Sequence, residues 1–359
     1  MQCANLGGME QASLQLMKAL QRRGHRLSVL SLNPLGDLRP LLLNSGIPAE
    51  GLTYRGKGGW RSWPELRRRL KATGADALLM TGHHLLAMLG LGEEWEGQKV
   101  LTIHFHHAGV KPIWQWRMIY RIASARFKSI TFPCDFIRHE AEKIYPAIKN
   151  RSQTIFYPLS LPELPTDAER TAVRKELGLP SGVPVVGNAG WLISRKRWDV
   201  YLRVAQLILR DRPDTLFLVA GDGPERESLQ KLASDLGISD AVRWLGWQQN
   251  MSRIYTALDV MLFNSDWDAV GMTPLEAMSY GLPVVASIIN GGLTEIVGND
   301  CGAVIIDSHD MKLLAASIDS FLDSPVKSQE AGIAGRNCVR RHCDPDKVAI
   351  KYEQLLQGR

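Results

Sequence analysis

The chain contains few cysteines, and their arrangement argues against a disulfide framework. There are 5 among 359 residues, an odd and scattered set, whereas small secreted domains use even, regularly spaced ones. Cys338 and Cys343 flank His342, but four residues separate the two cysteines and no second pair completes a zinc site. We therefore expect a reducing compartment without a disulfide framework, and we interpret Cys338 and Cys343 as ordinary helix residues. The full set is Cys3, Cys134, Cys301, Cys338 and Cys343.

Long apolar runs are also missing. No stretch approaches the ~20 apolar residues that a membrane-spanning helix needs, and the chain does not open like a secretory signal. A hydrophobic content of 45% with 22% charged residues is that of a globular protein. A length of 359 residues exceeds one ordinary core and fits two domains. The expected location is the cytoplasm.

Negative charge is scarce in the first half of the chain. Residues 1–165 contain 22 Lys and Arg against 12 Asp and Glu and so carry +10, while the remainder carries −4. Two clusters mix this positive charge with aromatic residues, which is typical of surfaces that lie on anionic lipid. Solvated helix faces with core tryptophans are the alternative, and both interpretations stay open. Nucleic acid is not an expected partner, because no nucleic-acid-binding module is present. The clusters are Arg55, Lys57, Trp60, Arg61, Trp63, Arg67, Arg68, Arg69 and Lys71, and Lys111, Trp114, Trp116, Arg117, Tyr120, Arg121, Arg126 and Lys128.

Short apolar runs alternate with helical patterns along the chain. Alternating β and α units are typical of parallel sheets covered by helices. Residues 157–165 carry three prolines and mark a boundary between two Rossmann-like domains that face one cleft. The predicted strands are 27–32, 77–80, 100–104 and 129–132, then 183–188, 215–220, 242–245, 260–263, 283–287 and 303–306, with helices that include 11–23 and 63–73.

The start of the chain is unusual for such a domain. The turn at Gly7 and Gly8 should follow the central first strand of a Rossmann-like sheet, yet only residues 1–6 precede it and they are not strand-like. We predict that this strand is truncated or that the natural start lies upstream. An intact mass of the native protein that shows Met1 as the first residue would contradict this prediction.

Two acids in the second half indicate a ligand site. Asp268 and Glu276 bracket seven residues directly after an apolar strand, and open α/β sheets bind ligands where strands pass into helices. Gly271 lets the backbone approach a ligand, and its amide with those of Met272 and Thr273 would open a helix whose N-terminus favours phosphate. Glu276 is placed to accept hydrogen bonds from a ribose, and Asp268 from a second polyol. The pattern indicates a sugar joined to a nucleotide by a diphosphate.

The run resembles the acid-x7-acid signature of glycosyltransferase family 4, whose members are retaining enzymes with the α/β GT-B fold of two Rossmann-like domains. The likeness extends over nearly the whole chain. It implies an acceptor-side domain over 1–160, a nucleotide-sugar-binding domain over 161–335, and a C-terminal helix over 336–359 that returns to the first domain. The other matching segments are Gly7–Glu10, Thr102–His104, Gly190–Lys196, Val219–Pro224, Leu245–Gly246 and Gly291–Glu295.

The resemblance also implies roles for single residues. Lys196 corresponds to a lysine that faces the donor diphosphate and can neutralise the leaving phosphate. His104 corresponds to a histidine beside the reacting centre, where its imidazole can donate to the donor sugar. Gly7 and Gly8 precede a helix, so their backbone can cradle a phosphate of donor or acceptor, although a tight turn explains them equally.

Two positions depart from the family pattern. Trp191 stands where the family has an arginine that contacts the diphosphate, and Arg195 or Arg197 is the expected replacement for that charge. Asp268 stands where the family has a glutamate, and an ordinary helix N-cap is the competing interpretation of this residue.

No metal or other cofactor is expected, because Lys196 and backbone dipoles can hold the diphosphate. The sequence Asp266-Trp267-Asp268 has the form of a metal-binding DxD motif but belongs to the acid signature. His106 and His107 lie beside His104, yet one strand cannot aim neighbouring side chains at a single ion.

These observations predict a retaining hexosyltransferase that moves a sugar from a nucleotide diphosphate sugar to a lipid-linked or polysaccharide acceptor, on the inner face of a membrane whose anionic surface attracts the basic first domain. A catalytically silent GT-B module that binds sugar or a protein partner is the alternative, and a sugar-nucleotide epimerase lacks support from the acid spacing. The predicted catalytic residues are His104, Lys196 and Asp268. The predicted donor-binding residues are Gly7, Gly8, Arg195, Lys196, Asp268, Gly271, Met272, Thr273 and Glu276.

Overall fold

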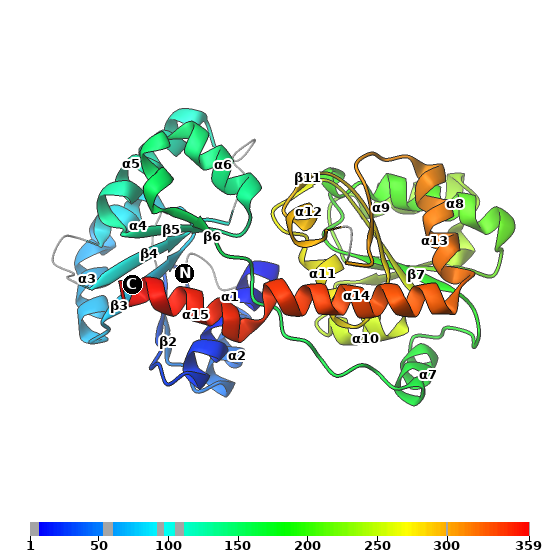
Figure 1. The fold of residues 1–359 in the computed structure, drawn as a ribbon, viewed down its shortest axis with the longest axis horizontal. Helices are drawn as coiled ribbons and strands as arrows, with labels where there is room; N and C mark the ends of the chain where they lie inside the picture. The colour runs from blue at the N-terminus through cyan, green and yellow to red at the C-terminus, as the bar shows by residue number, and fades with distance from the viewer. Residues whose placement is uncertain (1–6, 53–59, 92–96, 105–110, 299–300, 359) are drawn as a thin grey trace. The chain divides into compact units, whose positions relative to one another are not determined.

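The computed structural model describes residues 7–52, 60–91, 97–104, 111–298 and 301–358. They form two compact units, each built from parallel strands and helices (Figure 1). The first unit comprises the chain up to Ser160 together with the segment from Cys343 onward, and the second comprises Leu161 to His342. Within the described residues, no helix combines the length and the apolarity that crossing a lipid bilayer requires.

The described strands of the first unit form two parallel sheets. Strands β3, β4, β5 and β6 form one sheet in that order, and β1 pairs with β2 in the other. The four predicted strands of this half are confirmed to within a few residues, whereas β2 and β6 lack an apolar run and were not predicted. The strands are β1 Val29–Ser31, β2 Ala49–Gly51, β3 Ala77–Thr81, β4 Gln98–Thr102, β5 Ser129–Phe132 and β6 Ser152–Thr154.

Helices cover these strands, and the last one comes from the far end of the chain. Helix α15 packs its apolar face against α1, with Tyr352 placed so that its hydroxyl lies 3.3 Å from that of Thr102. Glu353 pairs with Arg23 and with His25 at its edge. The helices are α1 Gly8–Arg22, α2 Leu38–Asn44, α3 Trp63–Ala72, α4 Leu85–Gly90, α5 Ile113–Arg126, α6 Asp135–Ile144, the 3-10 helix η2 Pro146–Arg151, and α15 Pro345–Leu356.

A cavity of about 240 Å³ lies in the first unit, lined by residues of both sheets and of α1 and α15. Among the described residues, no strand pairs with both β1 and β3. The prediction of a truncated first strand falls on residues 1–6, which lie outside the described residues. The cavity lining includes Leu16, Leu30, Met80, His104 and Tyr352.

The second unit is built on one six-stranded parallel sheet with the order β12-β11-β10-β7-β8-β9. Because the chain starts at β7 and builds outward to both sides, the order reverses between β7 and β10, and such a switch point is where open α/β sheets bind ligands. All six predicted strands are confirmed, but β10 continues to Asp268 because it pairs with β11 from Met261 to its end. The strands are β7 Val185–Ala189, β8 Leu216–Ala220, β9 Val242–Gly246, β10 Val260–Asp268, β11 Val284–Gly291 and β12 Val304–Ile306.

Strands β7 and β8, both interior to this sheet, are buried along their whole length, as parallel strands covered by helices on both faces are. Tyr201 of α8 lies in this core and donates to the carbonyl of Leu218 at 2.9 Å. The helices are α7 Asp167–Glu176, η3 Ser194–Lys196, α8 Trp198–Asp211, α9 Arg226–Asp235, η4 Ser239–Ala241, α10 Met251–Ala257, α11 Met272–Ser279, α12 Leu293–Ile296, α13 Met311–Leu322 and α14 Pro325–Cys343.

The C-terminal segment differs in detail from the predicted single helix over 336–359. Helix α14 belongs to the second unit as far as His342, and the segment that joins the first unit begins at Cys343. The helix breaks because Pro345 cannot continue it, and Asp344 caps the next helix by accepting hydrogen bonds from the amides of Asp346 and Lys347, both at 3.0 Å.

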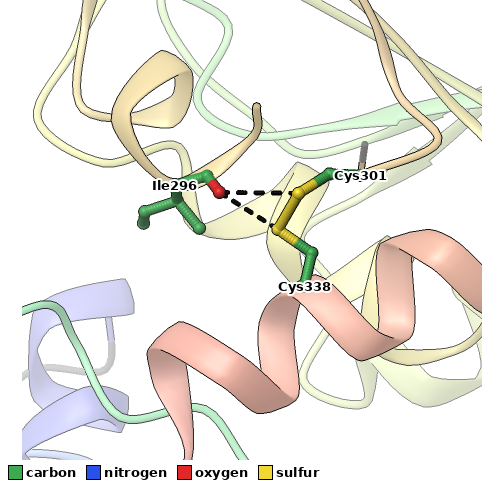
Figure 2. The surroundings of a disulfide bond; sticks show 3 residues. All are labelled: Ile296, Cys301 and Cys338. Carbon is green, nitrogen blue, oxygen red and sulfur yellow. Dashed lines mark hydrogen bonds between the residues drawn. A yellow bond between two sulfur atoms is a disulfide. The ribbon is translucent and has the colours of Figure 1, made fainter. Parts of the chain in front are cut away.

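The structure corrects the interpretation of Cys338 as an ordinary helix residue, because this cysteine forms a disulfide. Cys301, before β12, is joined to Cys338 of α14, with Cα atoms 5.5 Å apart. Figure 2 shows the carbonyl oxygen of Ile296 beside both sulfur atoms, 3.6 and 3.0 Å away. The two cysteines are 37 residues apart, so only the packing of α14 against the loop before β12 brings them together. Cys134 and Cys343 are also buried.

Candidate functional site

The carboxyl end of β10 turns into α11 around two of the predicted ligand residues. Gly271 has φ 76° and forms the N-cap of α11, a left-handed conformation that glycine adopts without steric cost. The amide of Gly271 donates to the Asp268 carboxylate. Met272 and Thr273 begin the helix, as predicted, and Pro274 completes its first turn. Asp268 itself is the last residue of β10, three residues before the N-cap, so the structure does not make it the N-cap of this helix.

Asp268 also forms an ion pair with Lys196. The two side chains are 17% and 13% exposed respectively, so water screens the pair only weakly. Burial works to raise the pKa of Asp268, but Lys196, Arg195 and the Gly271 amide together hold it below its usual value. The carboxylate is thus charged at neutral pH. In the ligand-free protein the Asp268 carboxylate therefore binds Lys196, the residue that the family resemblance assigns to the donor diphosphate.

The turn that carries Lys196 is tied to the end of β10 at several points. Arg195 donates to the carbonyl of Trp267 at 3.1 Å and lies over its ring, 4.5 Å from the centroid. The hydroxyl of Ser265 donates back to the carbonyl of Arg195 at 3.2 Å. These contacts fix the lysine close to the switch point of the sheet.

Arg197 directly follows the turn Ser194–Lys196 and anchors its C-terminal end. It has φ 45°, and among the described residues it is the one non-glycine residue with positive φ, a conformation that costs energy unless neighbours hold it. Its guanidinium binds both carboxylate oxygens of Asp199 at 3.0 Å and one oxygen of Asp266 at 3.2 Å. His309 also reaches Asp266, with Nε2 at 3.0 Å. The hydrogen bonds to Asp199 raise the pKa of Arg197 above its usual value. Burial lowers this pKa, but the hydrogen bond to Asp266 adds to the rise.

Glu276 lies in the second turn of α11 and is held by a residue that the sequence did not point to. The hydroxyl of Tyr255, on α10, donates to Glu276 Oε2 at 2.6 Å. The Tyr255 ring in turn packs against Tyr280, with centroids 5.4 Å apart. Burial raises the pKa of Glu276 above its usual range, and the hydrogen bond from Tyr255 offsets only part of that rise.

The glycine turn of the first unit already holds a carboxylate. Gly7 is the N-cap of α1, and Glu10 in the first turn is buried, with its side chain folded back toward Gly7. Burial raises the pKa of Glu10, while hydrogen bonds from its own amide and that of Gly7 lower it in part. A side chain of the protein itself therefore occupies the helix start at Gly7 and Gly8, where the sequence predicted a phosphate.

His104 lies just beyond the carboxyl end of β4 and is buried. Its Nδ1 is 2.6 Å from the hydroxyl of Tyr157, and its Nε2 has no hydrogen-bond partner among the described residues. Burial, together with the neighbouring His83, lowers the pKa of His104 to about 3, so the imidazole is neutral at pH 7. His106 and His107 lie outside the described residues. Where the structure does describe the chain, no three His, Cys, Asp or Glu side chains are grouped to hold a metal ion.

The basic clusters are only partly surface features. Trp116 and Tyr120 are core residues with no exposure, whereas Ile113, Trp114 and Met118 of the same helix are exposed. In the other cluster Arg68 and Arg69 pair with Glu65 of their own helix, and Arg55 and Lys57 lie outside the described residues. The cluster on α5 therefore remains the stronger candidate for a contact surface, and core packing explains its two buried aromatics.

Seven of the predicted residues lie at one edge of the second unit. Tyr255 and the pair Asp266 and His309 were missed, because each joins the site through contacts distant in sequence. A signal for Asp266 was available, since the run Asp266-Trp267-Asp268 had already been noted. The seven residues are Arg195, Lys196, Asp268, Gly271, Met272, Thr273 and Glu276, while Gly7, Gly8 and His104 belong to the first unit.

Two family models match the chain. The model described as Glycosyltransferase Family 4 matches residues 6–157, and the model described as Glycosyl transferases group 1 matches residues 169–337. They do not overlap, and together they cover most of the sequence.

Curated relatives are similar over part or most of their length. The lipopolysaccharide core biosynthesis glycosyltransferase LpsD of Rhizobium meliloti is 29% identical over 51% of this chain and 52% of its own length. The GDP-mannose-dependent monoacylated alpha-(1-6)-phosphatidylinositol monomannoside mannosyltransferase of Corynebacterium glutamicum is 25% identical over 76% of this chain and 74% of its own length. The match thus spans about half of the first relative and three quarters of the second.

Solved structures agree on the fold. Anabaena HepE in complex with UDP superimposes with a TM-score of 0.85 over 100% of this chain and 98% of HepE, at 17% identity. WaaG, described as a glycosyltransferase involved in lipopolysaccharide biosynthesis, gives a TM-score of 0.73 over 100% of this chain and 98% of WaaG, at 17% identity. The chain belongs to the family 4 glycosyltransferases, of the glycosyl transferases group 1 type, and has their GT-B fold.

Proposed function

We propose that the protein is a retaining glycosyltransferase that moves a hexose from a nucleotide diphosphate sugar to a lipid-linked or polysaccharide acceptor during assembly of a cell-envelope or extracellular glycan. The observation that carries the proposal is the arrangement at the carboxyl edge of the second sheet. There Lys196 and Asp268 are paired beside the N-terminus of α11, and Glu276 lies within that helix.

In this proposal the second unit holds the donor. The diphosphate takes the place of Asp268 on Lys196, and the amides of Gly271, Met272 and Thr273 add the positive end of the helix. Glu276 accepts hydrogen bonds from the ribose hydroxyls. Asp268, released from the lysine, is then able to accept hydrogen bonds from the sugar.

The reaction proposed is attack of the acceptor hydroxyl on the same face from which the diphosphate leaves. The departing phosphate oxygen takes the acceptor proton, and Lys196 with the helix amides stabilises the charge that develops on the diphosphate. His104 serves as a neutral hydrogen-bond donor to the sugar from Nε2, because the tautomer that accepts a hydrogen bond from the Tyr157 hydroxyl at Nδ1 carries its proton on Nε2. Lys196 and the amides carry the charge, so activity is expected to persist in EDTA.

The relatives support the donor and acceptor classes. HepE has been crystallised with UDP and with UDP-glucose, and the Corynebacterium glutamicum relative is named for GDP-mannose and a phosphatidylinositol mannoside. The Rhizobium meliloti relative is named for the lipopolysaccharide core. UDP and GDP are therefore the first nucleotides to test, and a glycolipid is the first acceptor class.

An anionic membrane surface is the proposed setting for such an acceptor. Helix α5 exposes Ile113, Trp114 and Met118, and Arg117 and Arg121 lie on the same helix beside a shallow hollow that Lys143 also lines. Aromatic and aliphatic side chains among cations are the combination that inserts into an anionic interface. We propose the cytoplasmic face of the membrane as the location, because that leaflet carries the anionic lipid.

Nucleotide binding is the first test of the donor site. Thermal unfolding is followed with UDP, GDP, ADP and TDP and their common sugars, for wild type and for Glu276→Ala. A shift with one nucleotide that the variant loses supports the donor site, and the matching sugar nucleotide then enters transfer assays in which NMR reports the anomeric configuration. Absence of any shift would favour the silent sugar- or partner-binding module.

Membrane binding has its own test. The double variant Ile113→Ser, Trp114→Ser is compared with wild type in cosedimentation with vesicles that contain or lack phosphatidylglycerol. Trp60→Ser is the control, because Trp60 is similarly exposed in the first unit but lies outside α5. The expected result is binding that needs phosphatidylglycerol and is lost only in the double variant; binding that is unaffected by the lipid would contradict the membrane proposal.

A further inference from the structure

Two tryptophans lie together on the surface of the second unit. The rings of Trp191 and Trp247 have centroids 5.3 Å apart and planes tilted by 48°, and their exposures are 54% and 48%. By contrast, Trp198 in the same unit is 1% exposed. Two large aromatic side chains left side by side in water forgo the stabilisation that burial provides, so such a pair suggests a binding surface.

The backbone beneath this pair is firmly held. Trp191 follows β7, and its carbonyl accepts a hydrogen bond from Trp198 Nε1 at 3.0 Å. Trp247 follows Gly246, whose φ of 65° turns the chain at the end of β9. Because β7 and β9 flank β8 in the sheet, the two tryptophans bracket the carboxyl end of β8. The loop there contributes Gly221, where an added Cβ would overlap the carbonyl oxygen of Gly190.

Helix α10 links this surface to the carboxylate proposed for the ribose. Ile254 in its middle packs on Ala189 and Ala220, at the ends of β7 and β8. The helix begins after Asn250, three residues beyond Trp247, and carries Tyr255, the partner of Glu276, near its other end. Five helical residues rise by about 7.5 Å, which a nucleoside can span. The segment that follows Trp247 and the partner of Glu276 therefore lie at the two ends of α10, at the same edge of the sheet.

We propose that Trp191 and Trp247 form the stacking platform for the nucleobase of the donor. The inference rests on the proposed function, because it places the base relative to a ribose on Glu276 and a diphosphate on Lys196. The base stacks on the outer face of the pair, since insertion between the rings would need a separation of about 7 Å and the centroids are 5.3 Å apart. Where the family pattern has a cation at position 191, this chain has a ring that recognises the base.

Stacking on a ring is tolerant of base identity, because every base has a π face. The platform therefore contributes affinity for the nucleoside, and discrimination between bases falls to polar groups at the base edge. It also explains how the donor can be held although Trp191 supplies no charge to the diphosphate. Contacts to the base thus contribute the part of the binding free energy that an arginine at position 191 would contribute through the diphosphate.

The test compares a probe that has a base with one that lacks it. Calorimetric titration uses the nucleoside diphosphate that stabilises wild type most, and inorganic pyrophosphate as the base-free probe. The variants are Trp191→Ala, Trp247→Ala and their Phe counterparts, with Trp60→Ala as the control for loss of an exposed tryptophan. Each Ala variant is expected to bind the nucleoside diphosphate about tenfold more weakly, which is ~1.4 kcal/mol, and to bind pyrophosphate as wild type does.

The outcomes separate this inference from the proposed function. Phe variants should retain most of the nucleotide affinity, because they keep a ring, and Trp60→Ala should change neither probe. Nucleotide affinity within twofold of wild type in both Ala variants would overturn the platform while leaving the donor site intact. An equal loss of pyrophosphate binding would overturn it as well. If wild type binds no nucleotide at all, the proposed function fails together with this inference.

Discussion

Replacing Asp268 with asparagine should have opposite effects on nucleotide binding and on stability. Asp268 is paired with Lys196 in the ligand-free protein, and both side chains are largely buried. A diphosphate that reaches Lys196 must displace this carboxylate or share the lysine with it. The Asp268→Asn variant removes the competing negative charge and leaves the lysine in place. We therefore expect nucleoside diphosphate to bind the variant more tightly.

The size of the effect follows from Coulomb's law. A phosphate oxygen on the far side of the lysine nitrogen lies roughly 5 Å from the carboxylate, and two unit charges at that distance interact by about 3 kcal/mol at an effective dielectric constant of about 20. Allowing for partial screening, we expect ~1–2 kcal/mol, or about 5- to 30-fold tighter binding. The free protein loses the counter-charge of Lys196, which should cost ~1–3 kcal/mol and lower the melting temperature by several degrees.

The assay is calorimetric titration with the nucleoside diphosphate, beside thermal unfolding without ligand. Asp266→Asn is the matched control, because Asp266 lies two residues away on β10 and binds Arg197 and His309. The Asp266→Asn variant should increase nucleotide affinity much less than Asp268→Asn does. Transfer of sugar should fall in Asp268→Asn, since the proposed sugar contact is lost. Unchanged or weaker nucleotide binding in Asp268→Asn would refute the reasoning.

Three further predictions follow from burial and backbone geometry. The raised pKa of Glu276 means that nucleotide affinity should fall as pH drops through that pKa, because only the carboxylate accepts both ribose hydroxyls; calorimetry from pH 8 to 5 should show this slope in wild type and not in Glu276→Gln. His104 has a folded-state pKa of about 3 against 6.5, so the unfolded chain takes up the proton first and stability present above pH 6.5 is lost progressively toward pH 3. The loss at pH 5.5 should be ~1.4 kcal/mol, and chemical unfolding of His104→Gln should lack it. Gly221→Ala should destabilise the second unit by ~3 kcal/mol more than Gly237→Ala, since an added Cβ overlaps the carbonyl of Gly190 in the first case and meets open space in the second; equal melting temperatures would contradict this.

Features with a local cause were readable from the sequence. The strands of the second unit are apolar runs between turns, and all six were predicted because a strand buried on both faces needs apolar residues throughout. The left-handed glycine at position 271 and the proline in the first turn of α11 follow from the conformations that these two residues favour. The acid signature therefore placed Asp268 and Glu276 correctly on a strand end and a helix.

Features that depend on pairing across the sheet were not readable. Strand β10 runs past the apolar stretch to Asp268 because the pairing with β11 continues as far as Asp268 and Gly291. Strands β2 and β6 carry no apolar pattern. They form because they pair with β1 and β5 respectively. The assignment of α14 to the second unit follows from packing that a helical pattern alone does not record.

The sequence by itself determined the family, the fold class and the chemical types of side chain available to a donor. Only the tertiary structure decided the partner of each side chain. Lys196 meets Asp268 across 72 residues, and Tyr255 meets Glu276 across 21. Cys301 meets Cys338 across 37. The reason is physical: propensities and turns act over a few residues, whereas hydrogen bonds and ion pairs between distant segments form only after the sheet has brought the ends of its strands to one edge.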